Sequence, residues 1–173
     1  MYIWTKLTRH VLEHFSAAKT LISAAIAPKT GAKLEFHPIA FFFVLPGKPN
    51  TFKAPRFCKH NVYTVHNKSM KSAREVLAEQ MWSPPLREVP LVAFIEFYFR
   101  RPKSHFKKGQ LKEDAPKFVI KTPDVDNCVK FVLDALQPRV IANDKTVTKI
   151  VAEKKWCLSD TEEMTLIELH VRV

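Results

Sequence analysis

The stretch that most constrains this chain is Lys121–Leu136, which reads KTPDVDNCVKFVLDAL. Pro123 fixes its own φ and donates no backbone hydrogen bond, so the preceding strand or loop must end there. Asp124 and Asp126 follow, one residue apart, where a helix is about to begin. One short carboxylate is enough to cap a helix. The second acid therefore needs another reason, and the leading hypothesis is a divalent cation such as Mg²⁺, which prefers oxygen ligands.

A helix is predicted from Asp126 to Leu136, because its apolar residues recur at three- and four-residue steps. Lys130 stands one helical turn after Asp126 and shares its face. A third acid, Asp144, lies beyond Pro138, which ends the helix. Should the chain fold back there, three acids would hold a metal against a scissile phosphate, with Lys130 contacting the phosphate or orienting the attacking water. Spacing alone does not decide whether Asp144 returns.

Charge predicts a polyanionic partner. The chain has 28 Lys and Arg against 17 Asp and Glu, a formal charge of +11 and a pI near 9.7. Nucleic acid is the first expectation, and an anionic membrane surface is the second. No apolar run reaches the roughly 18 residues of a spanning helix, so no membrane span is expected. Three separated cysteines without a CxxC motif indicate reduced thiols in a cytosol-like compartment.

The candidate DNA contacts lie in two segments. Residues 100–121 hold eight cations and two anions, a composition suited to counterion release from a nucleic-acid backbone. Residues 48–60 interleave cations with aromatic rings that can stack on bases, although a solvated loop anchored by Phe52 and Phe57 is an equal alternative. The expected contacts are Lys53, Arg56, Arg100, Arg101, Lys103, Lys107, Lys108 and Lys121.

The pattern predicts an α+β fold, with a mixed β-sheet of about five strands and helices packed on it. Strands are expected at 38–45, 62–65, 89–100, 147–155 and 164–173, and helices at 70–82 and 126–136. The last two strands are expected to pair as an antiparallel hairpin. Glu96, on the mixed face of the strand at 89–100, is expected to be paired or exposed rather than to bind metal.

Residues 1–36 form a separate amphipathic helical extension in this interpretation, and 37–173 form the main domain. Apolar residues from Trp4 to Ala25 make one helical stripe. We expect this helix to pack on the core or on a second subunit. A targeting presequence is the alternative, because the segment has few acids and several Ser, Lys and Arg residues.

Several motifs together resemble the RusA family of Holliday-junction resolvases over roughly residues 41–173. The resemblance rests on Pro123-Asp-x-Asp-Asn-x-x-Lys130, Leu133-Asp-Ala-Leu136, Asn143-Asp144, Val44-Leu-Pro-Gly-Lys-Pro49, Pro55-Arg-Phe57, Val62-Tyr-Thr64 and Phe97-Tyr-Phe-Arg-Arg-Pro-Lys103. The second acidic motif of the family is usually Asp-Asp, and here it begins with Asn143.

The resemblance implies a homodimeric, Mg²⁺-dependent endonuclease, with Mn²⁺ as a substitute, that resolves four-way DNA junctions by paired symmetric nicks in recombination and repair. It assigns Asp124, Asp126 and Asp144 as metal-binding catalytic acids and Lys130 as the catalytic lysine. It also implies a cytoplasmic, nucleoid-associated protein in a bacterium or phage, with organellar targeting by the extension as the alternative.

Three other interpretations are open from the sequence. A PD-(D/E)xK nuclease would combine Asp124 with Glu153 and Lys155, although a whole helix separates them. A non-catalytic or degenerate junction-binding protein would have the same basic segment. In the plainest interpretation Asp124 and Asp126 only cap a helix and form a turn, and Asp144 is merely solvated.

Overall fold

The computed structural model describes residues 36–52, 56–58, 61–63, 67–81, 83–158 and 163–172. The chain divides into two compact units, Met1–Glu35 and Phe36–Val173. The helical extension expected at the N-terminus lies outside the described residues, except that Phe36 already belongs to the first strand.

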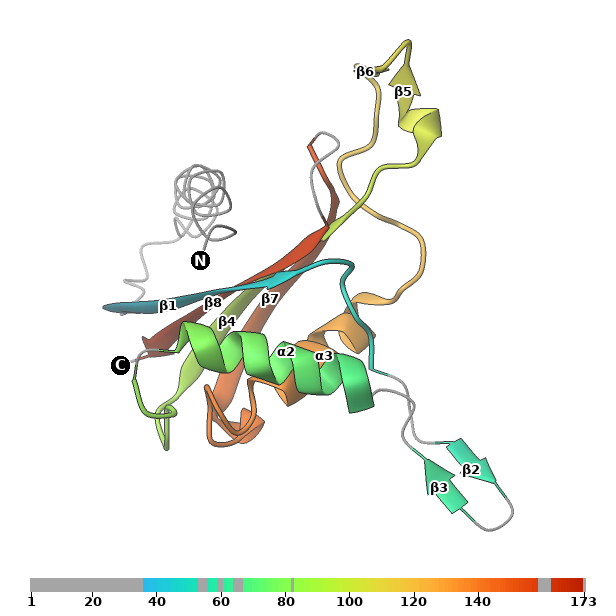
Figure 1. The fold of residues 1–173 in the computed structure, drawn as a ribbon. Coiled ribbons are helices and arrows are strands. Elements are labelled where there is room, and N and C mark those ends of the chain that lie inside the picture. Colours follow the sequence, from blue (N-terminus) through green and yellow to red (C-terminus); the bar gives the residue numbers. More distant parts are fainter. Residues whose placement is uncertain are drawn as a thin grey trace. The chain divides into compact units, whose positions relative to one another are not determined.

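The second unit is built on a four-stranded mixed sheet with the strand order β1-β8-β4-β7 (Figure 1). The strands are β1 (Phe36–Pro46), β4 (Leu91–Phe99), β7 (Val147–Trp156) and β8 (Met164–Arg172). β8 is antiparallel to both β1 and β4, whereas β4 and β7 are parallel. The expected α+β fold with a mixed sheet is confirmed, and the main sheet has four strands instead of about five.

The expected hairpin between the last two strands is wrong, because β4 lies between β7 and β8. Ile95 of β4 is opposite Ala152 of β7 on one side and Ile167 of β8 on the other. β4 suits the sheet interior because most of its side chains are apolar; even Val92 and Phe94, on the face away from the core, are 1% and 8% exposed, and Glu96 on that face is paired. The sequence pattern predicted the four strands of this sheet but did not predict which strands pair.

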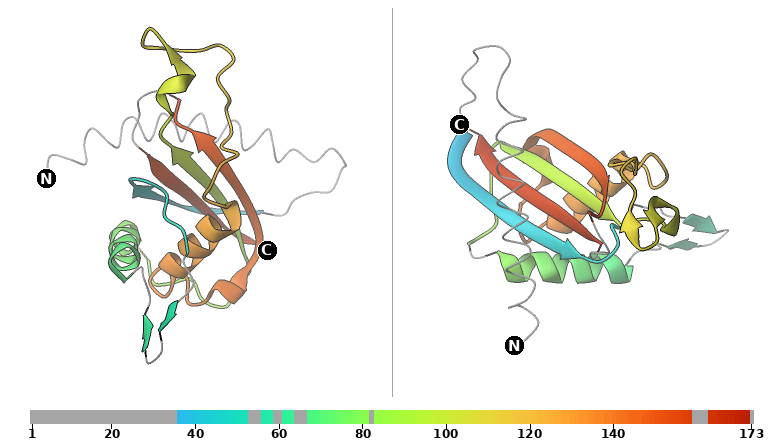
Figure 2. Two further views of the ribbon diagram at one scale, coloured as in Figure 1. Left: turned by 90° about the vertical axis from the view of Figure 1, so that its right-hand side faces the viewer. Right: turned by 90° about the horizontal axis from the view of Figure 1, so that it is seen from above.

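Two helices, α2 (Asn67–Gln80) and α3 (Val125–Leu136), cover the same face of this sheet (Figures 1 and 2). Helix α2 begins before the expected residue 70. The core lies between helices and sheet, and every second residue of β4 contributes to it, as the alternation predicted. The largest fully buried side chains include those of Phe43, Leu77, Leu91, Ile95, Phe97, Phe131, Leu136 and Ile167.

Helix α2 also protects the edge strand β1. The amide of Gln80 accepts a hydrogen bond from Val44 N and donates one to Val44 O, both at 2.8 Å. These bonds occupy backbone groups that an edge strand would otherwise leave open to pairing with another chain.

Two short hairpins stand outside the main sheet. β2 (Arg56–Cys58) pairs with β3 (Asn61–Tyr63), so the segment expected as a loop contains a strand. β5 (Phe106–Lys107) pairs with β6 (Gln110–Leu111) after the 3-10 turn η1 (Lys103–His105). Lys108 and Gly109, between these strands, both have positive φ, as a tight two-residue hairpin turn requires. Residues 103–117, here called the arm, extend beyond the C-terminal end of β4 (Figure 1).

No helix in the described part of the chain is both long and apolar enough to cross a membrane.

Candidate active site

Asp124 and Asp126 lie together at the N-terminal end of α3. Asp124 occupies the N-cap position with extended backbone, yet its side chain makes no capping hydrogen bond with any described residue. Asp126 lies in the first turn, and both residues are exposed. Neither carboxylate forms a salt bridge within the described ranges. The capping interpretation therefore does not explain Asp124, and the pair is free to provide oxygen ligands to a divalent cation.

The turn that carries this pair, residues 121–126, is here called the acid turn, and Lys154 of β7 holds it in place. Its Nζ donates hydrogen bonds to Lys121 O at 2.8 Å and to Pro123 O at 2.6 Å. The backbone of the same segment runs along the outer edge of β7, where Val119 N donates to Lys154 O and Trp156 N donates to Lys117 O, both at 3.0 Å. Sequence reasoning missed Lys154, because strand alternation gives its face but not the carbonyl groups it meets.

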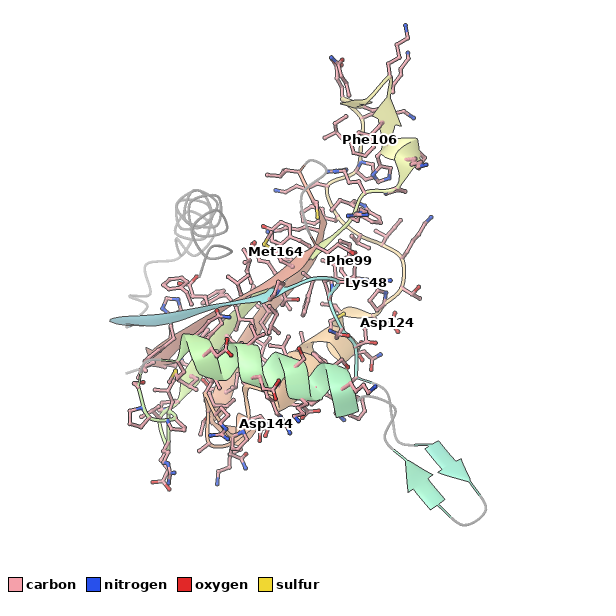
Figure 3. All side chains as sticks on the ribbon, in the orientation of Figure 1. Lys48, Phe99, Phe106, Asp124, Asp144 and Met164 are labelled. Atoms are coloured by element: carbon pink, nitrogen blue, oxygen red, sulfur yellow. The ribbon has the colours of Figure 1, made fainter. Side chains whose placement is uncertain are left out.

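Asp144 lies at the other end of β7. It begins the 3-10 turn η2 (Asp144–Thr146), directly before the strand. Val147 to Lys154 is seven steps of a strand, or about 23 Å at ~3.3 Å per residue. Figure 3 shows Asp124 and Asp144 at opposite ends of α3. The structure therefore does not bring the three acids together within one chain, and no group of three or more potential ligands forms among the described residues.

The separation of Asp144 follows from the topology. β7 is parallel to β4, so the connection through α3 must return the chain to the end of the sheet where β4 begins. Asp144, directly before β7, therefore lies at that end. Asn143 then has a structural task, because its side chain accepts a hydrogen bond from Lys145 N at 3.0 Å and caps η2. The bond requires only an acceptor oxygen, which the Asn143 amide supplies as well as a carboxylate would, and the neighbouring Asp144 is exposed.

Lys130 is held near the same end of α3 as the acid pair. Its Nζ lies 3.9 Å from the centroid of the Phe52 ring, a cation–π contact. Phe52 N in turn donates to Asn127 O at 2.8 Å, which fastens the loop before β2 to the first turn of α3. The catalytic role of Lys130, like the metal-binding roles of the three acids, stays a prediction.

The candidate DNA contacts divide into exposed residues and one buried residue. Arg101 is only 8% exposed; its Nε donates to Cys157 O at 2.5 Å and its Nη1 donates to Pro116 O at 2.8 Å. Arg101 therefore closes the base of the arm and is not available to DNA. Lys53 lies outside the described residues, and only the backbone is described at Arg56. Exposed side chains belong to Arg100, Lys103, Lys107, Lys108 and Lys121.

The surroundings of the acid turn and of the arm shift the pKa values of two side chains, Cys128 and His105. Burial raises the pKa of the Cys128 thiol to about 11; the charge of Lys154 opposes that rise, and Asp124 and Asp126 add to it. Cys128 is thus an inert thiol beneath the acid turn. Burial, and then the positive charges of Arg101, Lys112 and Lys121, lower the pKa of His105, whose ring packs edge-on against Trp156.

A separate ionic cluster occupies the opposite face of the sheet. Glu96 accepts a hydrogen bond from Tyr98 at 2.5 Å and forms a salt bridge with Lys155, which also pairs with Glu153 at 2.7 Å. Burial, followed by the hydrogen bond to Glu96, raises the pKa of Tyr98. Glu96 is therefore paired, as expected.

The positions of Glu153 and Lys155 in this cluster exclude the PD-(D/E)xK interpretation. Successive side chains of a strand point to opposite faces. Lys154 reaches the acid turn on the helix side, so Glu153 and Lys155 must point away from Asp124.

The acid pair Asp124–Asp126 begins α3, and the chain reaches it directly after the cationic arm. This arrangement suits a protein that acts on a nucleic-acid backbone. The family model described as Endodeoxyribonuclease RusA matches residues 46–167, and the chain belongs to this family. It is an endodeoxyribonuclease, an enzyme that hydrolyses phosphodiester bonds, from a family that resolves Holliday junctions. The match includes the acid turn, Lys130, the arm and Asp144. No curated protein matches the chain.

Proposed function

We propose that the protein is a Mg²⁺-dependent, homodimeric resolvase that cuts four-way DNA junctions by paired symmetric nicks during recombination and repair. The observation that carries the proposal is the open carboxylate pair Asp124–Asp126, held in place by Lys154 at the positive end of α3. The exposed lysines of the arm supply the nearby contacts to the DNA backbone.

The residues at the acid turn have separate tasks in this proposal. Asp124 and Asp126 hold the cation, which would activate water and offset charge at the phosphate. Lys130 binds a phosphate oxygen or orients the water, and its contact with Phe52 limits the positions its ammonium group takes. Lys154 fixes the carbonyl groups behind the turn, so that the two carboxylates keep one spacing.

Asp144 is assigned to a second copy of the chain. Within one chain, Asp144 and the acid pair lie at opposite ends of α3. We propose that Asp144 of the partner subunit completes each metal site in a dimer. A two-fold dimer would then contain two equivalent sites, which fits the cutting of two opposed strands.

The testing experiment is cleavage of a synthetic four-way junction beside a linear duplex of the same sequence, with Mg²⁺, with Mn²⁺ or with EDTA. We expect opposed nicks in the junction only when metal is present, and little cutting of the duplex. Protein that binds junctions tightly but cuts nothing with either metal would instead be a non-catalytic junction-binding protein.

A further inference from the structure

A cavity of about 220 Å³ lies beneath the loop that follows β1. Its mouth includes Lys48, Asn50 and Ser72, its walls include Phe131 and Val132 of α3, and Thr165 of β8 contributes a polar group. Figure 3 places Lys48 and Asp124 at the same end of the sheet and helices. Pockets for drug-sized ligands hold roughly 300–1,000 Å³, so this cavity suits a group the size of one heterocycle.

Thr165 is the unusual residue in this cavity. It is 3% exposed and lies opposite Leu45 and Phe97, so its side chain points toward the helices and the core. No hydrogen bond between described residues involves its hydroxyl. A buried hydroxyl without a partner destabilises a fold, and valine would fill the same space without that cost. A ligand that hydrogen-bonds to this hydroxyl would explain why threonine is there.

A backbone hydrogen bond connects the loop at the mouth of the cavity to the candidate active site. Gly47 adopts φ of 87° and its N donates to Glu163 O at 2.8 Å, which fixes the turn before Lys48. A few residues later, Phe52 N bonds to Asn127 O, beside Asp126. Lys48 is exposed and makes no salt bridge with another residue of the described ranges. A phosphate can therefore meet a free cation at the mouth.

We propose that this cavity takes one unpaired nucleobase of the DNA, extruded beside the branch point, which hydrogen-bonds through its edge to the Thr165 hydroxyl. Apolar walls suit the faces of a base, a hydroxyl suits its polar edge, and Lys48 suits the attached phosphate. The inference rests on the proposed function in taking branched DNA as the substrate, and it does not depend on cutting. It adds a base-contacting subsite next to the acid pair.

The test uses four-way junctions that carry the fluorescent base 2-aminopurine at one branch-flanking position at a time. Binding is measured in EDTA, so the result does not depend on cutting. We expect the full-length protein to raise the fluorescence strongly at one position and little elsewhere, because extrusion unstacks the base. Thr165→Val should weaken binding of a junction with that base by about fivefold, the effect of one neutral hydrogen bond. An abasic site at that position should abolish the difference between the variant and the wild type.

Thermal melting of the free protein separates the alternatives. Thr165→Val should melt at the same temperature as wild type or higher, because it removes an unpaired buried hydroxyl. The matched control is Thr148→Val, which loses a hydroxyl that donates to Leu91 O at 3.1 Å and should not change base binding. A lower melting temperature for Thr165→Val would indicate an internal partner such as a bound water and would overturn the proposal. So would a junction that shows no fluorescent position, even if it is cut normally.

Discussion

Lys154 Nζ donates a hydrogen bond of 2.6 Å to Pro123 O, which joins the end of β7 to the residue directly before Asp124. The bond connects the rigid sheet to the loop that carries the acid pair. Because the same ammonium group also bonds to Lys121 O, it fixes two carbonyl groups of one turn. Lys154 thus holds the turn that carries both carboxylates, although among the described residues it forms a salt bridge with neither of them.

Replacing Lys154 with methionine should weaken metal binding by about tenfold, the usual effect of losing a group that orients a ligand. Calorimetric titration with Mn²⁺ measures this directly, and the Mg²⁺ concentration for half-maximal cutting should rise in parallel. Lys154→Arg should restore part of the affinity, because it keeps the charge and the donors. Lys149→Met, on the exposed part of β7, is the control; equal metal affinity in both methionine variants would remove Lys154 from the site.

Asp126→Asn should reduce junction cutting by at least about a hundredfold while junction binding stays the same or tightens. The reason is that the change removes a proposed metal ligand and also a negative charge that repels phosphate. Gel-shift and cleavage assays on one preparation check both quantities. Asp134→Asn on the same helix is the control and should cut normally. A large fall in melting temperature for Asp126→Asn would support a structural role for the carboxylate instead.

Mixing two inactive variants tests the shared metal site. A dimer of one Asp126→Asn chain and one Asp144→Asn chain has one intact site if each site combines the acid pair of one chain with Asp144 of the partner subunit. Such mixed dimers should nick one strand of a junction, whereas each variant alone should be inactive. If every site came from a single chain, the mixture would stay inactive. Native mass spectrometry confirms that mixed dimers are present.

Reversing the charges of Lys107 and Lys108 in the arm should weaken binding to all DNA sequences alike. Each lost phosphate contact should also reduce the slope of log affinity against log salt by about one. Fluorescence anisotropy across a salt series gives both values. Lys71→Glu, at an exposed position of α2, is the control. An unchanged slope would place the tip of the arm outside the DNA interface.

His105 should make the base of the arm sensitive to acid. Its pKa is lowered in the fold, so the unfolded chain binds a proton more readily, and stability should fall as pH drops below about 6.5. His105→Gln should reduce this fall without removing the arm. Melting temperatures of both proteins between neutral and mildly acidic pH provide the check. Parallel curves for the two proteins would show that another group causes the dependence.

Local patterns in the sequence determined much of this protein. The alternation in Leu91–Phe99 identified the central strand, and the spacing after Pro123 identified α3 and its two leading acids. The same motifs identified the family. These features are readable because side-chain periodicity and turn chemistry depend on residues a few positions apart.

Only the tertiary structure decided which distant groups meet. It inserted β4 between β7 and β8, and it kept Asp144 at the far end of α3 from Asp124. It also buried Arg101, a predicted DNA contact, among carbonyl groups and turned Lys154 toward Pro123. Charge and periodicity give the type of a side chain and its face. The partners of that side chain depend on strand order and helix packing, which the burial of the whole core selects.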